Sequence, residues 1–145
     1  MSGGFSSPPG LTLAQVQAAF DGSPYIRTLG LKAAAQDLEA GELTVHIPWQ
    51  PQFERGAGTK QWHGGPLASI IDTVGDFALA QQLGRGLPTI NFRVDYLRPA
   101  VDTGLTAVSR VRRNGRSVGV ADVDLFDDQG RLVATGRANY ATLVA

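Results

Sequence analysis

The sequence predicts an α+β domain in which one long helix is covered by an antiparallel sheet of about six strands. Residues 66–83 carry an apolar stripe at helical spacing. Residues 42–48 and 89–97 alternate apolar and polar side chains, as half-buried strands do. The strand candidates after the helix are separated by short turns, which require antiparallel neighbours.

Size and composition fit one globular domain spanning residues 1–145, with a flexible Gly-, Ser- and Pro-rich tail at residues 1–10. Hydrophobic residues make up 43% of the chain and charged residues 18%. Thirteen basic and thirteen acidic residues cancel, which gives no general electrostatic reason to bind nucleic acid or an anionic membrane. No run is apolar enough for a membrane helix and no signal peptide is recognisable, so we expect a cytoplasmic protein.

The residue types also narrow the chemistry. The chain has no cysteine, which excludes disulfides, thiolate nucleophiles and cysteine-based zinc sites. The two histidines show no metal-ligand spacing, and no phosphate loop or dinucleotide fingerprint is present. We therefore expect neither a metal nor a cofactor.

Before the long helix, the sequence predicts a short helix and two strands. The helix covers residues 12–21, with Thr12 as its N-cap and Gly22 and Pro24 as its stop. The strands cover residues 31–36 and 42–48. Residues 49–62 are expected to form an irregular connection.

In the long helix, Pro66 suits the first helical position and Gly84 suits the position just past the end. Asn114-Gly115 predicts a two-residue hairpin turn, and residues 127–130 predict a second turn. The strands expected after the helix cover residues 89–97, 104–112, 117–126 and 131–143.

The most informative stretch for function is the start of the long helix. Gly64 and Gly65 precede Pro66, so their backbone N–H groups lie at the positive end of a helix dipole. Such groups can form an oxyanion hole, which binds the negative oxygen of an acyl-transfer intermediate. The alternative is a tight entry to a helix with no functional role.

Asp72 lies in the middle of this helix, at the edge of its apolar stripe. A partly buried carboxylate there favours general-base chemistry, although such residues are often structural. Asp76 lies one turn further on and either lines the same pocket or is a surface neighbour. Gly64 and Asp72 are separated by about 12 Å of helix rise, too far to touch one substrate carbonyl. Joint action would therefore need two protomers with antiparallel helices across a two-fold axis.

His63-Gly64-Gly65 followed by Asp72, together with Tyr96-Leu97-Arg98-Pro99-Ala100, resembles the PaaI-type acyl-CoA thioesterases of the hotdog superfamily. The resemblance extends from about Leu31 to the C-terminus. It implies the hotdog fold, an acyl-CoA substrate, and a homodimer that often pairs into a tetramer.

The resemblance also implies roles for particular residues. Asp72 matches the general base or nucleophile, and Gly64 matches the oxyanion-hole amide supplied by the partner subunit. His63 matches a histidine that supports the loop, and Thr89 a hydroxyl that holds the water or the carboxylate. The family commonly has Asn or Gln where this chain has Ala57. Gln61 or Gln52 would then supply the amide, or the protein binds acyl-CoA without cleaving it.

Further residues are candidates for substrate binding. Arginine side chains match phosphate oxygens, so a cluster at the predicted hairpin is a candidate clamp for the CoA phosphates, although solvated turn charges are the alternative. The acyl chain is expected in a slot between the two helices of a dimer, beside Gly65 and Asp76. The clamp residues are Arg112, Arg113, Asn114 and Arg116, with Arg98 as a weaker candidate, and the slot residues include Ile71, Val74 and Phe77.

Overall fold

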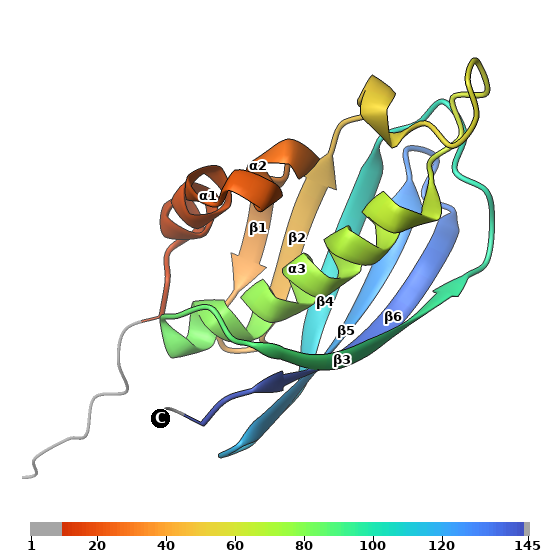
Figure 1. Ribbon diagram of the computed structural model, residues 1–145. Coiled ribbons are helices and arrows are strands. Elements are labelled where there is room, and N and C mark those ends of the chain that lie inside the picture. Colours follow the sequence, from red (N-terminus) through yellow and green to blue (C-terminus); the bar gives the residue numbers. More distant parts are fainter. Residues whose placement is uncertain (1–9, 144–145) are drawn as a thin grey trace, which may run out of the picture.

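The computed structural model describes residues 10–143 and shows one antiparallel sheet curved around a long helix, α3 (Gly64–Leu83) (Figure 1). This confirms the predicted α+β architecture. The six strands are β1 (Lys32–Asp37), β2 (Glu42–Ile47), β3 (Thr89–Tyr96), β4 (Leu105–Asn114), β5 (Val118–Asp127) and β6 (Leu132–Ala141), in the sheet order β1-β2-β4-β5-β6-β3.

Two short helices precede the sheet, where the sequence predicted one. The first, α1 (Leu13–Gly22), is capped by the Thr12 side chain, as expected. The predicted end of this helix is confirmed, since α1 ends at Gly22, but the second helix, α2 (Pro24–Leu29), which begins at Pro24, was not predicted. Proline has the backbone φ of a first helical residue and needs no N–H there, so it can open a helix as well as end one.

The core lies between α3 and the concave face of the sheet. Ile70, Ile71 and Val74 of α3 are fully buried there. Phe77 packs edge-to-face against Phe20 of α1, with ring centroids 4.8 Å apart. The helix therefore buries its apolar stripe within its own protomer, which fixes which residues of α3 remain accessible.

The start of α3 differs from the prediction. Pro66 was expected at the first helical position, but α3 begins at Gly64, and His63 is its N-cap. The His63 imidazole accepts the Gly65 amide at 2.9 Å, which extends the helix by two residues ahead of the proline. Pro66 is tolerated because the first turn of a helix has no intrahelical acceptors for its N–H groups.

The loops of the sheet match the prediction in part. The turn predicted at residues 127–130 is confirmed, with Gly130 at φ 77°. The hairpin predicted at Asn114-Gly115 was wrong by two residues, because the Gly115 amide bonds to the Val118 carbonyl at 3.0 Å and the bend lies at residues 116–117. The connection between β2 and α3 contains a short 3₁₀ helix, η1 (Pro51–Phe53).

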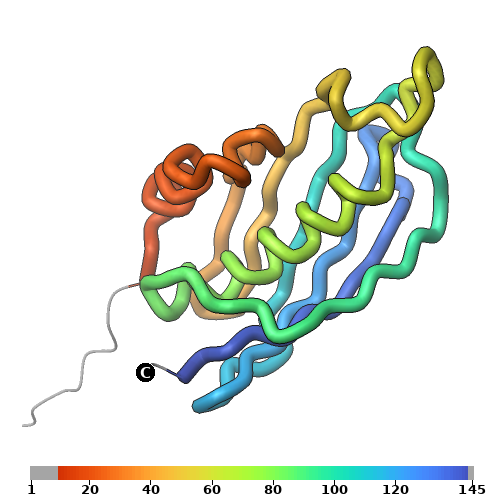
Figure 2. The backbone as a smooth tube through the Cα atoms, viewed as in Figure 1, coloured from red at the N-terminus to blue at the C-terminus, as the bar shows by residue number. Residues whose placement is uncertain are grey.

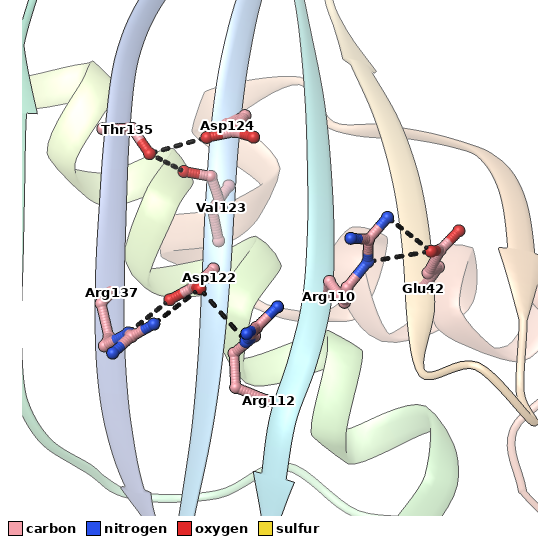
Figure 3. A network of polar contacts seen from close by, with 8 residues as sticks. All are labelled: Glu42, Arg110, Arg112, Asp122, Val123, Asp124, Thr135 and Arg137. Atoms are coloured by element: carbon pink, nitrogen blue, oxygen red, sulfur yellow. Dashed lines mark hydrogen bonds and ion pairs between the residues drawn. The ribbon is translucent and has the colours of Figure 1, made fainter.

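The convex face of the sheet carries paired charges (Figure 3). Arg137 and Arg112 flank the carboxylate of Asp122 at 2.6 and 3.6 Å, and Arg110 contacts Glu42 at 2.9 Å. These pairs are exposed and contribute little to stability individually. They explain why this face is polar while the face toward α3 is apolar.

Two predictions concern the chain as a whole. The predicted tail lies outside the described residues apart from Gly10, beside which the Leu11 amide bonds to the Gln81 carbonyl. Among the helices of residues 10–143, none is both long and apolar enough to cross a membrane.

Candidate active site

The start of α3 forms one side of the candidate site. His63 caps the helix by accepting the Gly65 amide at 2.9 Å. The Gly64 N–H is engaged by no residue in the range 10–143. It lies in the first turn of a twenty-residue helix, where the dipole favours a negative ligand.

Aromatic side chains hold this loop in place. Trp62 stacks on Phe53 with centroids 4.8 Å apart, and its indole N–H donates to the Thr103 carbonyl at 2.8 Å. The Tyr96 hydroxyl donates to the Gly64 carbonyl at 2.8 Å. The Tyr96 and His63 contacts therefore fix the Gly64–Gly65 peptide, and Trp62 packs the chain just before it, so Gly64 is held in position at the start of α3.

A pocket of about 640 Å³ opens beside this helix start. Gln61 is among its lining residues, whereas Gln52 and Ala57 are not. Of the two glutamines that were candidates for the side-chain amide, only Gln61 therefore lines this pocket. Arg98 also lines the pocket, together with Arg55. The full lining is Arg55, Gln61, Trp62, His63, Gly64, Gly65, Leu67, Tyr96, Leu97, Arg98, Pro99 and Ala100.

The second half of the candidate site is the Asp72 carboxylate. Asp72 is half-buried in the middle of α3, and its Oδ1 accepts the Thr89 hydroxyl at 2.7 Å. Its backbone carbonyl accepts the hydroxyl of the fully buried Tyr140 at 2.6 Å. Burial raises the pKa of Tyr140, with the Asp72 and Asp76 carboxylates adding to the effect, so its hydroxyl remains a donor at neutral pH. Both the side chain and the backbone of Asp72 are thus held.

Asp76 lies one helical turn after Asp72 and is also half-buried. Its Oδ1 accepts the Leu87 amide at 3.0 Å, which places it against the connection from α3 to β3. Burial, with a smaller contribution from Asp72, raises the pKa of Asp76 to about 7 despite the Leu87 hydrogen bond. Asp76 thus contacts the connection from α3 to β3, and the sequence-based alternatives, a lining residue of the pocket or a surface neighbour of Asp72, stay predictions.

The residues expected to line the acyl slot are placed differently from the prediction. Ile71 and Val74 are fully buried and Phe77 is 7% exposed, all within the protomer's own core. They face the sheet and α1, because the apolar stripe of α3 is needed to cover the concave face. This corrects the expectation that these three side chains line an open slot.

The predicted arginine clamp lies at the opposite end of α3 from Gly64 (Figure 2). Asn114 contacts Gln82 at 3.3 Å, near the helix C-terminus, and Arg112 bonds to Asp122 on the convex face. Arg113 and Arg116 are exposed and make no ion pair with any residue in the range 10–143. Within one protomer the cluster is thus remote from the glycine loop.

Sequence reasoning missed several residues of this region. Tyr96 and Tyr140 reach the helix from strands distant in the sequence, and Leu87 from the connection that follows the helix, so no local pattern indicates their contacts. Arg55 comes from a connection without periodicity, whereas Gln61, from the same connection, was already a candidate for the amide. Across residues 10–143 there is also no cluster of three or more histidine, aspartate or glutamate side chains that could hold a metal ion.

Comparison with known proteins identifies the family. The sequence model of the thioesterase superfamily matches residues 60–134, which include the glycine loop, Asp72 and Thr89. The medium/long-chain acyl-CoA thioesterase YigI of Escherichia coli is 31% identical over 133 residues, covering 81% of this chain and 84% of the relative. The acyl-coenzyme A thioesterase PaaI of Escherichia coli is 30% identical over 122 residues, covering 83% of each.

Solved structures agree with this assignment. The solved structure of Escherichia coli PaaI, from the phenylacetic acid degradation operon, superposes with a TM-score of 0.75 at 27% identity, covering 89% of this chain and 91% of the other. Another structure from the thioesterase superfamily superposes with a TM-score of 0.83 at 32% identity, covering 89% of this chain and 96% of the other. The chain therefore belongs to the thioesterase superfamily and has its hotdog fold.

Proposed function

We propose that this protein hydrolyses acyl-CoA thioesters, with Asp72 as general base or nucleophile. The observation that carries the proposal is the Asp72–Thr89 contact, which fixes a half-buried carboxylate on the helix that also begins with the glycine loop. Oδ2 of Asp72 has no hydrogen-bond partner among residues 10–143 and is not enclosed, so it is free to meet water or substrate. The relatives named as acyl-CoA thioesterases support this substrate class.

The Gly64 amide supplies the oxyanion hole in this proposal. Water, activated by Asp72, attacks the thioester carbon, and the carbonyl oxygen takes up negative charge that the Gly64 N–H stabilises. The C–S bond then breaks, giving the free acid and the CoA thiol after proton transfer. If Asp72 attacks instead, water cleaves the resulting anhydride in a second step.

The two groups belong to different protomers of a homodimer. About 12 Å of helix separates Gly64 from Asp72 within one chain, so the amide of one copy serves the carboxylate of the other. Strand β3, at the edge of the sheet, provides the surface for a second copy. Large apolar side chains on and beside this strand are 40–57% exposed, namely Ile90, Phe92, Tyr96, Leu97 and Val101.

The CoA phosphates are assigned to arginines at the rim of the site. Arg55 and Arg98 line the pocket that contains Gly64, and Gln61 supplies the amide that Ala57 lacks. If the α3 helices of the two protomers run antiparallel, the C-terminal end of one α3 lies near the glycine loop at the start of the partner's α3. Arg113 and Arg116 of one protomer would then approach the pocket of its partner, where they complete the phosphate site.

A non-catalytic acyl-CoA-binding protein is the second candidate function. The observation that favours it is Ala57, an exposed alanine where the family commonly has an amide side chain. The two functions predict the same binding of acyl-CoA and differ only in turnover. A dimer of dimers fits either one.

The test is release of free thiol from short-, medium-, long-chain and aryl acyl-CoAs, with wild type, Asp72→Asn and Glu39→Gln. Glu39 is an exposed turn residue and serves as the matched carboxyl control. We expect turnover in wild type and in Glu39→Gln, and a loss of roughly 10²–10⁴-fold in Asp72→Asn. Binding without turnover on the whole panel would establish the non-catalytic function, and full activity of Asp72→Asn would exclude the proposed mechanism.

A further inference from the structure

The connection from α3 to β3 is tied to the helix at two points one turn apart. The Leu87 amide donates to Asp76 at 3.0 Å, and the Thr89 hydroxyl donates to Asp72 at 2.7 Å. The two carboxylates, at positions i and i+4, lie on the same helix face about 6 Å apart along the axis. Two residues of extended chain span about 6.6 Å, so the spacing of the two donors matches that of the two acceptors.

The same segment is fixed on its other side by β6. Thr89 pairs with Tyr140, and the Ala141 amide donates to the Pro88 carbonyl at 2.9 Å. Pro88 has no N–H, so the Leu87 amide is the last backbone donor before the strand. Leu87 is 6% exposed, and a buried amide without an acceptor costs free energy. Asp76 is the group that satisfies it.

We propose that Asp76 is a positioning residue: by holding the Leu87 amide, it fixes the start of β3 where the Thr89 hydroxyl reaches Asp72. This inference rests on the proposed function, in which Asp72 reacts with water or substrate. Asp76 itself touches neither. A shift of the reacting groups by about 1 Å can cost 10²-fold in rate, so the exact placement of Thr89 has a direct catalytic consequence.

The titratable groups around Asp76 determine its charge. The groups that face it are Asp72 on α3 and Tyr140 on β6, and burial raises its pKa. Arg85, the cation nearest in sequence, donates to the Thr142 carbonyl at 2.6 Å. Asp76 Oδ1 accepts a backbone amide, whereas Asp72 Oδ1 accepts the Thr89 hydroxyl.

A double-mutant cycle separates positioning from general stabilisation. The variants are Asp76→Ala, Thr89→Val and the two combined, with Asp76→Asn as the matched control because its amide oxygen can still accept from Leu87. We expect Asp76→Ala to lower kcat about tenfold with KM changed less than about twofold. Asp76→Asn should keep kcat within about twofold. In the Thr89→Val background, Asp76→Ala should cause no further loss, because its effect passes through Thr89.

Additive losses of kcat in this cycle would overturn the positioning role of Asp76. The proposed function would still hold in that case, provided that activity depends on Asp72. Amide hydrogen exchange provides a readout that needs no turnover. We expect the Leu87 and Thr89 amides to exchange at least about tenfold faster in Asp76→Ala than in wild type or Asp76→Asn, with β4 and β5 unchanged. Equal exchange in all three proteins would overturn the inference even if the protein were not an enzyme.

Discussion

The two ends of α3 are surrounded by different kinds of contact. At the N-terminal end, Gly64 and Gly65 leave backbone exposed beside a pocket of about 640 Å³. At the C-terminal end, the Gln81 side chain is fully buried, donating to the Glu42 carbonyl at 2.9 Å and accepting from Gln36 at 3.0 Å. One end is open for a ligand, and the other is closed by hydrogen bonds.

Asp72 lies between these two ends, and its carboxylate is both hydrogen-bonded, as the C-terminal end is, and accessible, as the N-terminal end is. One of its oxygens is held by Thr89 and the other is free. A single helix therefore supplies both a binding surface and the rigid frame that orients the reacting group. Changes at the open end should therefore alter activity, whereas changes at the closed end should alter stability.

Among the changes that compare the ends of α3, the largest effect is expected at Gly64. Gly64→Pro removes the proposed oxyanion donor while keeping a residue that suits the first helical position, and His63, at ψ 147°, already has the extended backbone that precedes proline. We expect kcat to fall by roughly 10²–10³-fold with little change in the unfolding midpoint. Steady-state thiol release and chemical denaturation measure the two quantities.

Gly64→Ala is the matched control for this change. It adds a similar Cβ, 3.3 Å from the Tyr96 ring, but keeps the N–H. If Gly64→Ala lost as much activity as Gly64→Pro, crowding against Tyr96 would explain the effect and the amide would have no special role.

A smaller effect, on stability alone, is expected at Gly75. An added Cβ there would lie 2.5 Å from the Tyr140 hydroxyl and 3.3 Å from Val123. We expect Gly75→Ala to lower the free energy of unfolding by about 1–3 kcal/mol, despite the better helix propensity of alanine. In a Tyr140→Phe background the same change should cost at least about 1 kcal/mol less, because the clashing oxygen is gone. Urea denaturation of the four proteins measures this, and an undiminished cost would mean that Tyr140 is not the obstacle.

An effect of at most similar size is a dependence of stability on pH that arises from Asp76. Burial raises its pKa to about 7 from an ordinary value of 3.8, so folding favours the protonated form. The stability it contributes is complete below the ordinary value and is lost as pH rises toward 7. Relative to Asp76→Asn, wild type should therefore weaken between pH 5 and 7 by at most about 1.4 kcal/mol per pH unit. Denaturation midpoints that differ by a constant amount at every pH would contradict the raised pKa.

Most of the fold could be predicted from local patterns. The apolar stripe of α3 and the alternation in β2 and β3 depend on side chains that meet the core at fixed periods, so they are readable in one dimension. The errors fell where local signals have two meanings. Pro24 can end one helix or begin another, and the helix start depends on the His63 side chain rather than on Pro66.

The candidate site was predictable only in its short-range parts. His63, Gly64 and Asp72 lie on one segment, and their spacing is visible in the sequence. The Tyr140 hydroxyl reaches the Asp72 carbonyl from 68 positions away, and such a contact leaves no periodic signal. The acyl-slot residues were placed wrongly although their apolar stripe is visible in the sequence. Such a stripe can line a slot or fill a core, and here it packs against the concave face of the sheet.

The most direct test of the account is complementation between two inactive variants. Asp72→Asn and Gly64→Pro are mixed in equal amounts, unfolded and refolded together, so that half of the dimers are mixed. Each mixed dimer would hold one intact site, made from the Gly64 amide of one protomer and the Asp72 carboxylate of the other. We expect about one quarter of wild-type thiol release. A mixture no more active than its parents would contradict a site shared between protomers.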